Sequence, residues 1–183
     1  MFTPDTFVTA CKDCVNGGGV ADDIERIVRE ALRSQAQDPT LWHGDELMYR
    51  SPGLTVVNLA LPGRARTPIH DHGVWAVIGI SVGCEIDRFY RVGPDGLTPA
   101  GHVEVHSGQT VCLAVDVIHA IENPGAQVAR GLHVYGGDLA AVARRMWDPR
   151  TQRAVAFHPP TFEQWGEELS AAEAPNLPPG ERP

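Results

Sequence analysis

The chain has 183 residues, of which 43% are hydrophobic and 21% are charged, and this composition suits one globular domain with a sizeable core. Acidic residues outnumber basic ones, the net charge is -8, and no long basic cluster is present, so we expect no nucleic-acid partner. The longest nearly apolar run, residues 74–84, is too short to span a bilayer, and the first residues lack the basic and apolar regions of a secretory signal. We therefore expect a cytoplasmic protein with no membrane partner; its oligomeric state stays open.

The first 40 residues predict two helices, over residues 4–15 and about 20–37. In the second, apolar residues recur at positions i, i+3, i+4, i+7 and i+8, the spacing of one helix face. These residues are Ile24, Ile27, Val28, Ala31 and Leu32. Asp22 or Asp23 can cap the start of this helix, and Pro39 marks its end.

Cys11 and Cys14 form a CxxC motif within the first predicted helix. Such a pair can be redox-active or can bind zinc, but no second CxxC motif follows and the segment does not belong to a βαβ unit. We interpret these residues as buried thiols, because free cysteine is among the most buried residue types. The four cysteines of the chain are too few and too scattered for a secreted disulfide framework.

Between about residues 54 and 135 the sequence consists of short β-branched runs, which turn signals such as Asn123-Pro124-Gly125 separate. Many short strands without intervening helices predict an antiparallel sandwich or barrel. The expected strands cover residues 55–61, 75–82, 85–92, 102–106, 109–115 and 127–135.

After the barrel, we expect residues 138–147 to form a helix that Asp138 caps. The segment from Pro159 onward is rich in Pro, Glu and Ala, and we expect a tail that Trp165 pins to the body before a mobile end. The predicted organisation is therefore one domain over residues 1–183, with helices over 1–40, a barrel over 45–137, and a helix and tail over 138–183.

His70 and His72 lie on either side of Asp71 in a strand-like segment. Successive strand residues point to opposite faces, so the two histidines share a face and Asp71 points away. The best candidate for a third ligand is His119, within another β-rich run. Three neutral imidazoles can bind one divalent transition metal. From the pair alone, surface or structural histidines remain an alternative.

His102, Glu104 and His106 place two imidazoles and a carboxylate on one face of another predicted strand. A rival metal site is conceivable there. These residues alternate with valines, however, and this alternation is typical of the solvated face of a half-buried strand. We interpret them in that way.

With these residues laid out, the chain resembles the cupin superfamily, whose small double-stranded β-helix, or jelly-roll, barrel holds a metal through two short motifs. The residues that match these motifs are Gly63, His70, His72 and Gly83 for the first, and Gly108, His119 and Asn123 for the second. The resemblance implies a mainly β cupin barrel, to which the apolar spacing adds N-terminal helices and a short C-terminal helix. The carboxylate that usually follows the first motif is absent, since Trp75 and Ala76 stand there, and this indicates an all-histidine site.

Within the cupins, the segments 67–72 and 133–138 are similar to the thiol dioxygenases, the group of cysteine dioxygenase and 3-mercaptopropionate dioxygenase. The resemblance covers roughly residues 45–150. It implies a non-haem Fe(II) ion and the conversion of a thiol to a sulfinic acid with O2. The residues that it implies as metal ligands are His70, His72 and His119, with His133 and Tyr135 beside them. Tyr135 shares a strand face with His133, which can orient the tyrosine hydroxyl toward the reacting oxygen. Ordinary barrel-lining residues are the alternative for this pair.

The sequence departs from this group at several positions. Gly131 stands where a serine usually precedes the His-X-Tyr pair, so a relay would end at His133 or at a water. Val77 replaces the cysteine that crosslinks to the tyrosine of cysteine dioxygenase, so we expect no crosslink. The arginine that precedes the barrel in animal cysteine dioxygenases has no counterpart around residues 41–44, where His43 can line the site mouth. Cysteine is therefore not the expected substrate.

In the mercaptopropionate enzymes, a helix arginine nine residues beyond the tyrosine binds the substrate carboxylate. Arg144 stands at that position, and a guanidinium can bind a carboxylate with two parallel hydrogen bonds. A solvated helix face is the alternative for Arg144. Other candidates for the anion are Arg50, Arg64 and Arg66.

These features predict an Fe(II)-dependent thiol dioxygenase that takes O2 and a small thiol with a carboxylate, such as 3-mercaptopropionate or mercaptosuccinate. Two alternatives stay open because of the missing serine and arginine. One is a metal-dependent cupin enzyme of other chemistry, and the other is a non-catalytic cupin that binds a small molecule. Imidazole sites also accept Zn, Ni or Cu, so the metal and the thiol are not fixed at this point.

Overall fold

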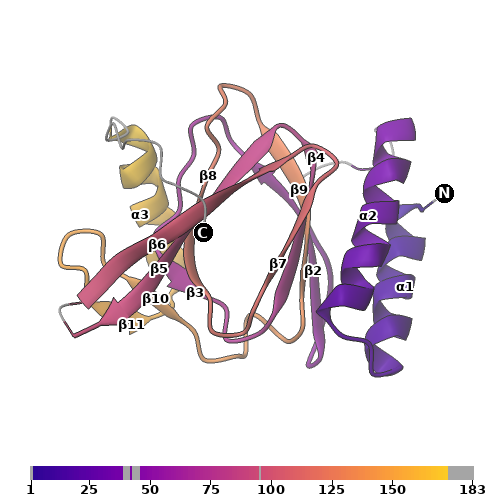
Figure 1. Ribbon diagram of the computed structural model, residues 1–183, viewed down its shortest axis with the longest axis horizontal. Helices are drawn as coiled ribbons and strands as arrows, with labels where there is room; N and C mark the ends of the chain where they lie inside the picture. Colours follow the sequence, from indigo (N-terminus) through magenta and orange to yellow (C-terminus); the bar gives the residue numbers. More distant parts are fainter. Residues whose placement is uncertain (1, 39–41, 43–45, 95, 173–183) are drawn as a thin grey trace.

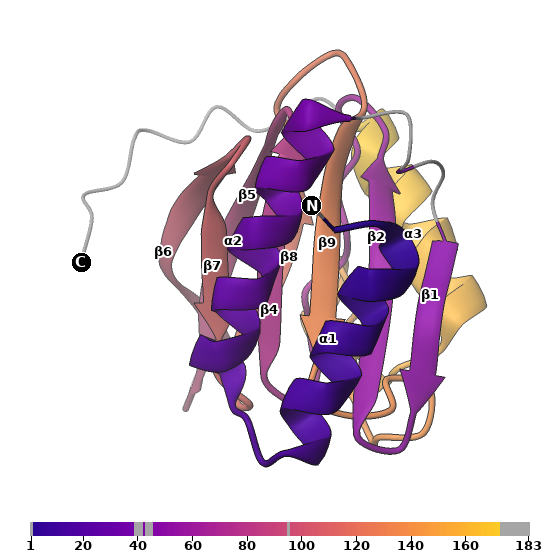
Figure 2. The same ribbon diagram turned by 90° about the vertical axis from the view of Figure 1, so that its right-hand side faces the viewer.

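Two N-terminal helices cover one face of a β-barrel in the computed structural model, which describes residues 2–38, 42, 46–94 and 96–172 (Figures 1 and 2). Helix α1 spans Pro4–Asn16 and helix α2 spans Ala21–Gln37, as predicted. The N-cap residue of α2 is Val20, so neither Asp22 nor Asp23 is the cap that we expected. Asp23 lies in the first turn and accepts a hydrogen bond from the backbone N–H of Val20 at 3.2 Å. Pro39, the predicted end marker, lies outside the described residues.

The apolar face of α2 packs on the sheet as its spacing predicts. Ile24, Val28, Ala31 and Leu32 are buried in one cluster with residues of both helices and of the sheet beneath. Gly79 makes this close contact possible, because a Cβ atom there would lie 2.4 Å from Cγ1 of Val28. The packing of α2 on the sheet therefore depends on the absence of a side chain at residue 79.

The CxxC cysteines lie within α1, as expected. Cys11 is fully buried in the helix–sheet cluster and Cys14 is half-buried. Burial raises the pKa of Cys11 to about 12, so its thiol stays protonated at neutral pH. All four cysteines are free. The interpretation as a buried thiol is confirmed for Cys11.

The strands form two antiparallel sheets that face each other around the interior (Figure 1). One sheet has the order β1-β2-β9-β4-β7 and the other the order β11-β10-β3-β8-β5-β6. The predicted mainly β jelly-roll barrel, with N-terminal helices and a short C-terminal helix, is thereby confirmed. The strand bounds are β1 Glu46–Ser51, β2 Leu54–Leu61, β3 His70–Asp71, β4 Ala76–Val82, β5 Cys84–Gly93, β6 Gly96–His106, β7 Thr110–Leu113, β8 Ile118–Glu122, β9 Ala129–Tyr135, β10 Arg145–Trp147 and β11 Ala154–Ala156.

The helix predicted over residues 138–147 is wrong. Asp138 starts a single turn, in which its carbonyl accepts the N–H groups of Ala141 and Val142, and Arg145–Trp147 then forms β10. Met146 is paired with His70 of β3 and is buried. These long-range contacts outweigh the local helix propensity of the alanine-rich segment.

The C-terminal helix instead occupies the segment for which we expected a tail. Helix α3 spans Pro159–Ala171, and Pro159 at its first position is well suited to a helix start. The ring of Phe162 on this helix lies 5.0 Å from that of His70 and 4.9 Å from that of Phe157. Trp165 is half-buried. No helix of the described part is long and apolar enough to cross a membrane.

Candidate metal centre

The three predicted ligand histidines come together on the inner side of the β3–β8 pair. His70 and His119 are direct register partners on these strands, and His72 follows His70 on the same face. The Nε2 atom of His72 lies 3.2 Å from Nε2 of His70 and 3.2 Å from Nε2 of His119. All three side chains are buried. One ion between the three nitrogens could be reached by all of them.

Hydrogen bonds at the opposite ring nitrogens orient two of these imidazoles. Nδ1 of His70 faces the carbonyl of Pro68 at 3.0 Å, and Nδ1 of His119 faces Oδ1 of Asp87 at 2.7 Å. Because both partners are acceptors, Nδ1 carries the proton in each neutral ring, and the Nε2 lone pairs of both rings face His72.

This arrangement fits a divalent metal ion. A neutral His72 has one proton and cannot satisfy two lone pairs at once, whereas a cation would bind all three nitrogens. Burial, and secondly the neighbouring His119, hold the pKa of His70 and of His72 well below the usual value. Both rings are therefore neutral at pH 7, which is the form that binds metals.

Asp71 points away from the three histidines, as the strand alternation predicts. Its carboxylate accepts two hydrogen bonds from Arg145, one from the backbone N–H at 2.6 Å and one from Nε at 2.8 Å. The middle residue of the His-X-His motif thus holds β10 against β3. Asp71 thus stabilises the position of the motif but offers no ligand atom to the metal site.

His133 and Tyr135 lie beside the histidine cluster on β9. Nδ1 of His133 is 3.2 Å from the hydroxyl of Tyr135, whose ring centroid is 4.9 Å from that of His72. Burial lowers the pKa of His133 to about 3, and burial raises the pKa of Tyr135. Both side chains are therefore neutral at pH 7, and Tyr135 retains its hydroxyl proton.

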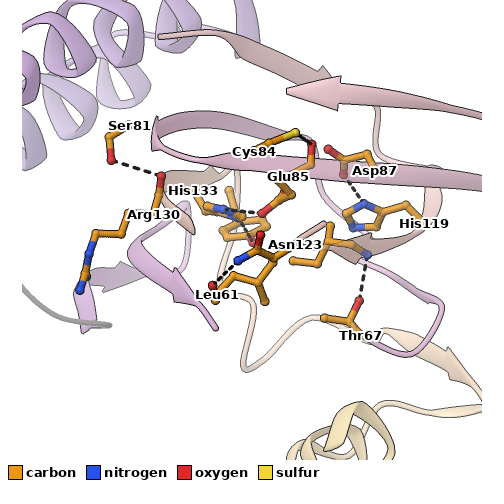
Figure 3. A network of polar contacts seen from close by, with 12 residues as sticks. Leu61, Thr67, Ser81, Cys84, Glu85, Asp87, His119, Asn123, Arg130 and His133 are labelled. Atoms are coloured by element: carbon orange, nitrogen blue, oxygen red, sulfur yellow. Dashed lines mark hydrogen bonds and ion pairs between the residues drawn. The ribbon is translucent and has the colours of Figure 1, made fainter. Parts of the chain in front are cut away.

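Two buried carboxyl groups behind the site were missed in the sequence. Glu85 and Asp87 extend from β5 into the interior, toward His133 and His119 respectively (Figure 3). They alternate with Ile86 and Arg88, so the acidic residues of this strand face inward, against the usual polarity of a barrel strand. No pattern within the strand itself shows that its acidic residues are the ones that face inward, since Ile86 between them is buried as well.

Arg144 lines the same cavity as the histidine cluster, although it does not stand on a helix. The cavity has a volume of about 180 Å³, and its apolar wall includes Phe157 and Phe162. The guanidinium of Arg144 stacks on Phe157, with Cζ 3.6 Å from the ring centroid. Within the described part of the chain, no acidic side chain forms an ion pair with Arg144.

The other candidate arginines are engaged elsewhere. Arg50 forms a two-point ion pair with Asp138, and Arg64 donates to the carbonyl of Pro124 at 2.7 Å. Arg66 lines a different cavity. His43, the candidate for the site mouth, lies outside the described residues.

The rival cluster on β6 lies on the outer surface. Glu104 and His106 are exposed, His102 is half-buried and the intervening Val105 is buried, which confirms the interpretation as the solvated face of a half-buried strand. Cys84 joins Glu104 and His106 with donor atoms within 4.8 Å of one another. This group lacks the buried surroundings of the three-histidine cluster.

Asn123, the last residue of the second cupin-like motif, has a structural position. Its side-chain amide donates to the carbonyls of Leu61, Pro62 and Gln127, and its oxygen accepts the N–H of Gly125. It therefore holds the turn between β8 and β9 in place.

No protein-family model matches this chain. Solved structures similar to it include the cupin domain of Cnp3 from Schizosaccharomyces pombe, with 12% identity over 52% of this chain and 61% of that chain and a TM-score of 0.44. A single-residue variant of oxalate decarboxylase from Bacillus subtilis is 19% identical over 50% of this chain and 23% of that chain, with a TM-score of 0.39. An oxalate oxidase in complex with the substrate analogue glycolate is 18% identical over 46% and 42%, with a TM-score of 0.38. Each alignment spans less than two thirds of the solved chain.

Proposed function

We propose that this protein is a non-haem Fe(II)-dependent thiol dioxygenase that oxidises a small, carboxylate-bearing thiol to its sulfinic acid. The observation that carries the proposal is the composition of one cavity. It contains three histidine donors without a carboxylate donor, the His133–Tyr135 pair and an arginine without an acidic partner in the described chain. The resemblance of the sequence motifs to thiol dioxygenases supports the same assignment.

The reaction is balanced without a further reductant. The thiol R–SH and O2 give R–SO2H; both oxygen atoms are transferred to sulfur, which loses the four electrons that O2 gains. A ferrous ion held by His70, His72 and His119 would supply a doubly charged centre with open positions for a thiolate and O2, because neutral imidazoles do not offset its charge.

Arg144 is the residue proposed to bind the substrate. Its guanidinium can hold a carboxylate through two charge-assisted hydrogen bonds, and the stacked ring of Phe157 fixes its plane. The cavity volume of about 180 Å³ is below the range of roughly 300–1,000 Å³ that is typical of drug-sized ligands. A thiol of a few carbon atoms therefore suits the cavity better than a peptide or a nucleotide does.

Tyr135 is proposed to donate its hydroxyl proton in a hydrogen bond to the reacting oxygen. Its raised pKa keeps the phenol protonated, and Nδ1 of His133 contacts the phenol oxygen. The rings of Phe157 and Phe162 line the same cavity and would limit the access of water to the reacting atoms. We place the reaction in the cytoplasm, which the four free cysteines support.

The test is oxygen uptake by protein loaded anaerobically with one equivalent of Fe(II). The thiols to compare are 3-mercaptopropionate, mercaptosuccinate, cysteine and the carboxylate-free 2-mercaptoethanol. We expect uptake with the first two, one O2 per thiol, and a sulfinate product that carries both labelled atoms of 18O2. Stoichiometric iron binding without uptake for any of the thiols would refute the proposal.

A further inference from the structure

Because residue 131 is a glycine, it offers no side-chain partner to Nε2 of His133. A Cβ atom on Gly131 would lie 3.3 Å from Nε2 of His133, so the side-chain position of residue 131 is directed at this nitrogen. The same Cβ would lie 2.9 Å from Cδ1 of Ile80 and 3.0 Å from the carbonyl oxygen of Gly79. Packing therefore disfavours a side chain at residue 131, and a hydrogen bond to His133 must come from another element.

The carboxyl group of Glu85 faces this nitrogen from strand β5. Its Oε2 atom lies 3.7 Å from Nε2 of His133, and both side chains are buried (Figure 3). Within the described residues, Nε2 of His133 and Oε1 of Glu85 have no hydrogen-bond partner. The distance between Oε2 and Nε2 is too long for a direct hydrogen bond. Buried polar groups left unpaired in this way are costly, and one bridging water or a small approach of the two side chains would remove that cost.

The surroundings of Glu85 favour its carboxylic acid form. Burial, and secondly the neighbouring carboxyl group of Asp87, raise the pKa of Glu85 well above its usual value. Asp87 is already engaged with Nδ1 of His119 through Oδ1. A protonated Glu85 has an O–H donor, whereas the neutral ring of His133 has one lone pair to accept it.

We propose that Glu85 is a positioning residue of the site: through one bridging water, or directly after a small approach, its carboxyl O–H donates toward Nε2 of His133 and fixes the tautomer whose Nδ1–H donates to the hydroxyl oxygen of Tyr135. The tyrosine proton is then free to point into the cavity. In the other tautomer, Tyr135 would donate to Nδ1 of His133 and its proton would point away from the substrate. Glu85 thus takes the place of the hydroxyl that Gly131 lacks.

This inference rests on the proposed function in one respect only, namely the reacting oxygen to which Tyr135 would donate its hydrogen bond. The tautomer of His133 needs neither iron nor turnover, so it is measured on chelator-treated protein labelled with 15N-histidine. Long-range 1H–15N correlation spectra distinguish the two tautomers, and a His133→Asn variant assigns the signals. We expect the Nδ1–H tautomer in the wild-type protein.

Two substitutions at Glu85 then separate its roles. Glu85→Gln retains an N–H donor and should keep the Nδ1–H tautomer, whereas Glu85→Leu removes the donor and should populate the Nε2–H tautomer. Glu104→Gln on the exposed face of the neighbouring strand β6 is the matched control and should change nothing. An Nε2–H tautomer in the wild type, or an unchanged Nδ1–H population in Glu85→Leu, would overturn the proposal.

An infrared measurement keeps the proposal falsifiable even if Glu85→Leu does not fold. The C=O stretch of a protonated carboxyl group should be present in the wild type at neutral pH and absent in Glu85→Gln; identical spectra overturn the proposal. In the iron-loaded enzyme, Glu85→Leu should lower kcat by about 10-fold to 100-fold with KM unchanged, and Glu85→Gln should lose less. Absence of thiol oxidation in an enzyme whose tautomer depends on Glu85 would refute the proposed function and leave this inference standing.

Discussion

On the proposed function, replacement of Arg144 by Gln should remove the preference for thiols with a carboxylate over thiols without one. The substitution removes two charge-assisted hydrogen bonds to the substrate, and hydrogen bonds to charged groups contribute about 1.5–3 kcal/mol. Arg144 is half-buried, so we take this range for the pair as a whole. At about 1.4 kcal/mol per factor of ten, kcat/KM for 3-mercaptopropionate should fall about 10-fold to 150-fold.

The assay is initial-rate oxygen uptake with 3-mercaptopropionate and, in parallel, with 2-mercaptoethanol, which has no carboxylate. The second thiol should show nearly the same kcat/KM in the wild type and in Arg144→Gln. Arg145→Gln is the matched control: its side chain pairs with Asp71 outside the cavity, and its backbone N–H still binds that carboxylate. An equal loss for both thiols in Arg144→Gln, or no loss for either, would refute the assigned role.

Three further predictions concern stability and metal binding. Because the pKa of His133 falls to about 3 on folding, the unfolded chain binds the additional proton below its ordinary pKa near 6.5. Urea titrations of chelator-treated protein should therefore show the free energy of unfolding decreasing as pH falls from 6.5, by about 1.4 kcal/mol per pH unit from this residue; His133→Asn should flatten the curve. Gly79→Ala should destabilise the protein by about 1–3 kcal/mol through overlap with Val28, and unchanged urea midpoints would contradict the close helix packing. Asp87→Asn should weaken metal binding about 10-fold or more in calorimetry, because Asp87 orients His119; equal affinities would show that the hydrogen bond is dispensable.

The parts of the site that depend on residues close together in the sequence could be predicted from the sequence alone. Strand alternation predicts that His70 and His72 share a face, and His119 lies in a strand of its own, so the three-histidine cluster follows from short-range patterns and the β-barrel. The N-terminal helices follow likewise from apolar spacing. Arg144 lines the cavity, but from the irregular segment directly before β10 instead of from a helix.

The rest depends on contacts between distant segments. The alanine-rich segment before β10 has helix propensity, yet Met146 is drawn into a strand by pairing with His70. Glu85 was not recognised because a carboxyl group in a barrel strand is normally expected to face solvent. Its inward position is understandable only with His133 of the opposite sheet beside it, and no local pattern contains that information.

The order of these segments along the chain has a consequence for synthesis on the ribosome. His70, His72 and His119 belong to β3 and β8, which pair with each other and are synthesised before the segment that carries Phe157 and Phe162. The wall of the cavity is completed later, when Phe157 and Phe162 of the C-terminal region arrive. A nascent chain therefore has an interval in which the three histidines are present and the wall formed by Phe157 and Phe162 is not, so an ion would meet a more open site during synthesis than in the complete chain.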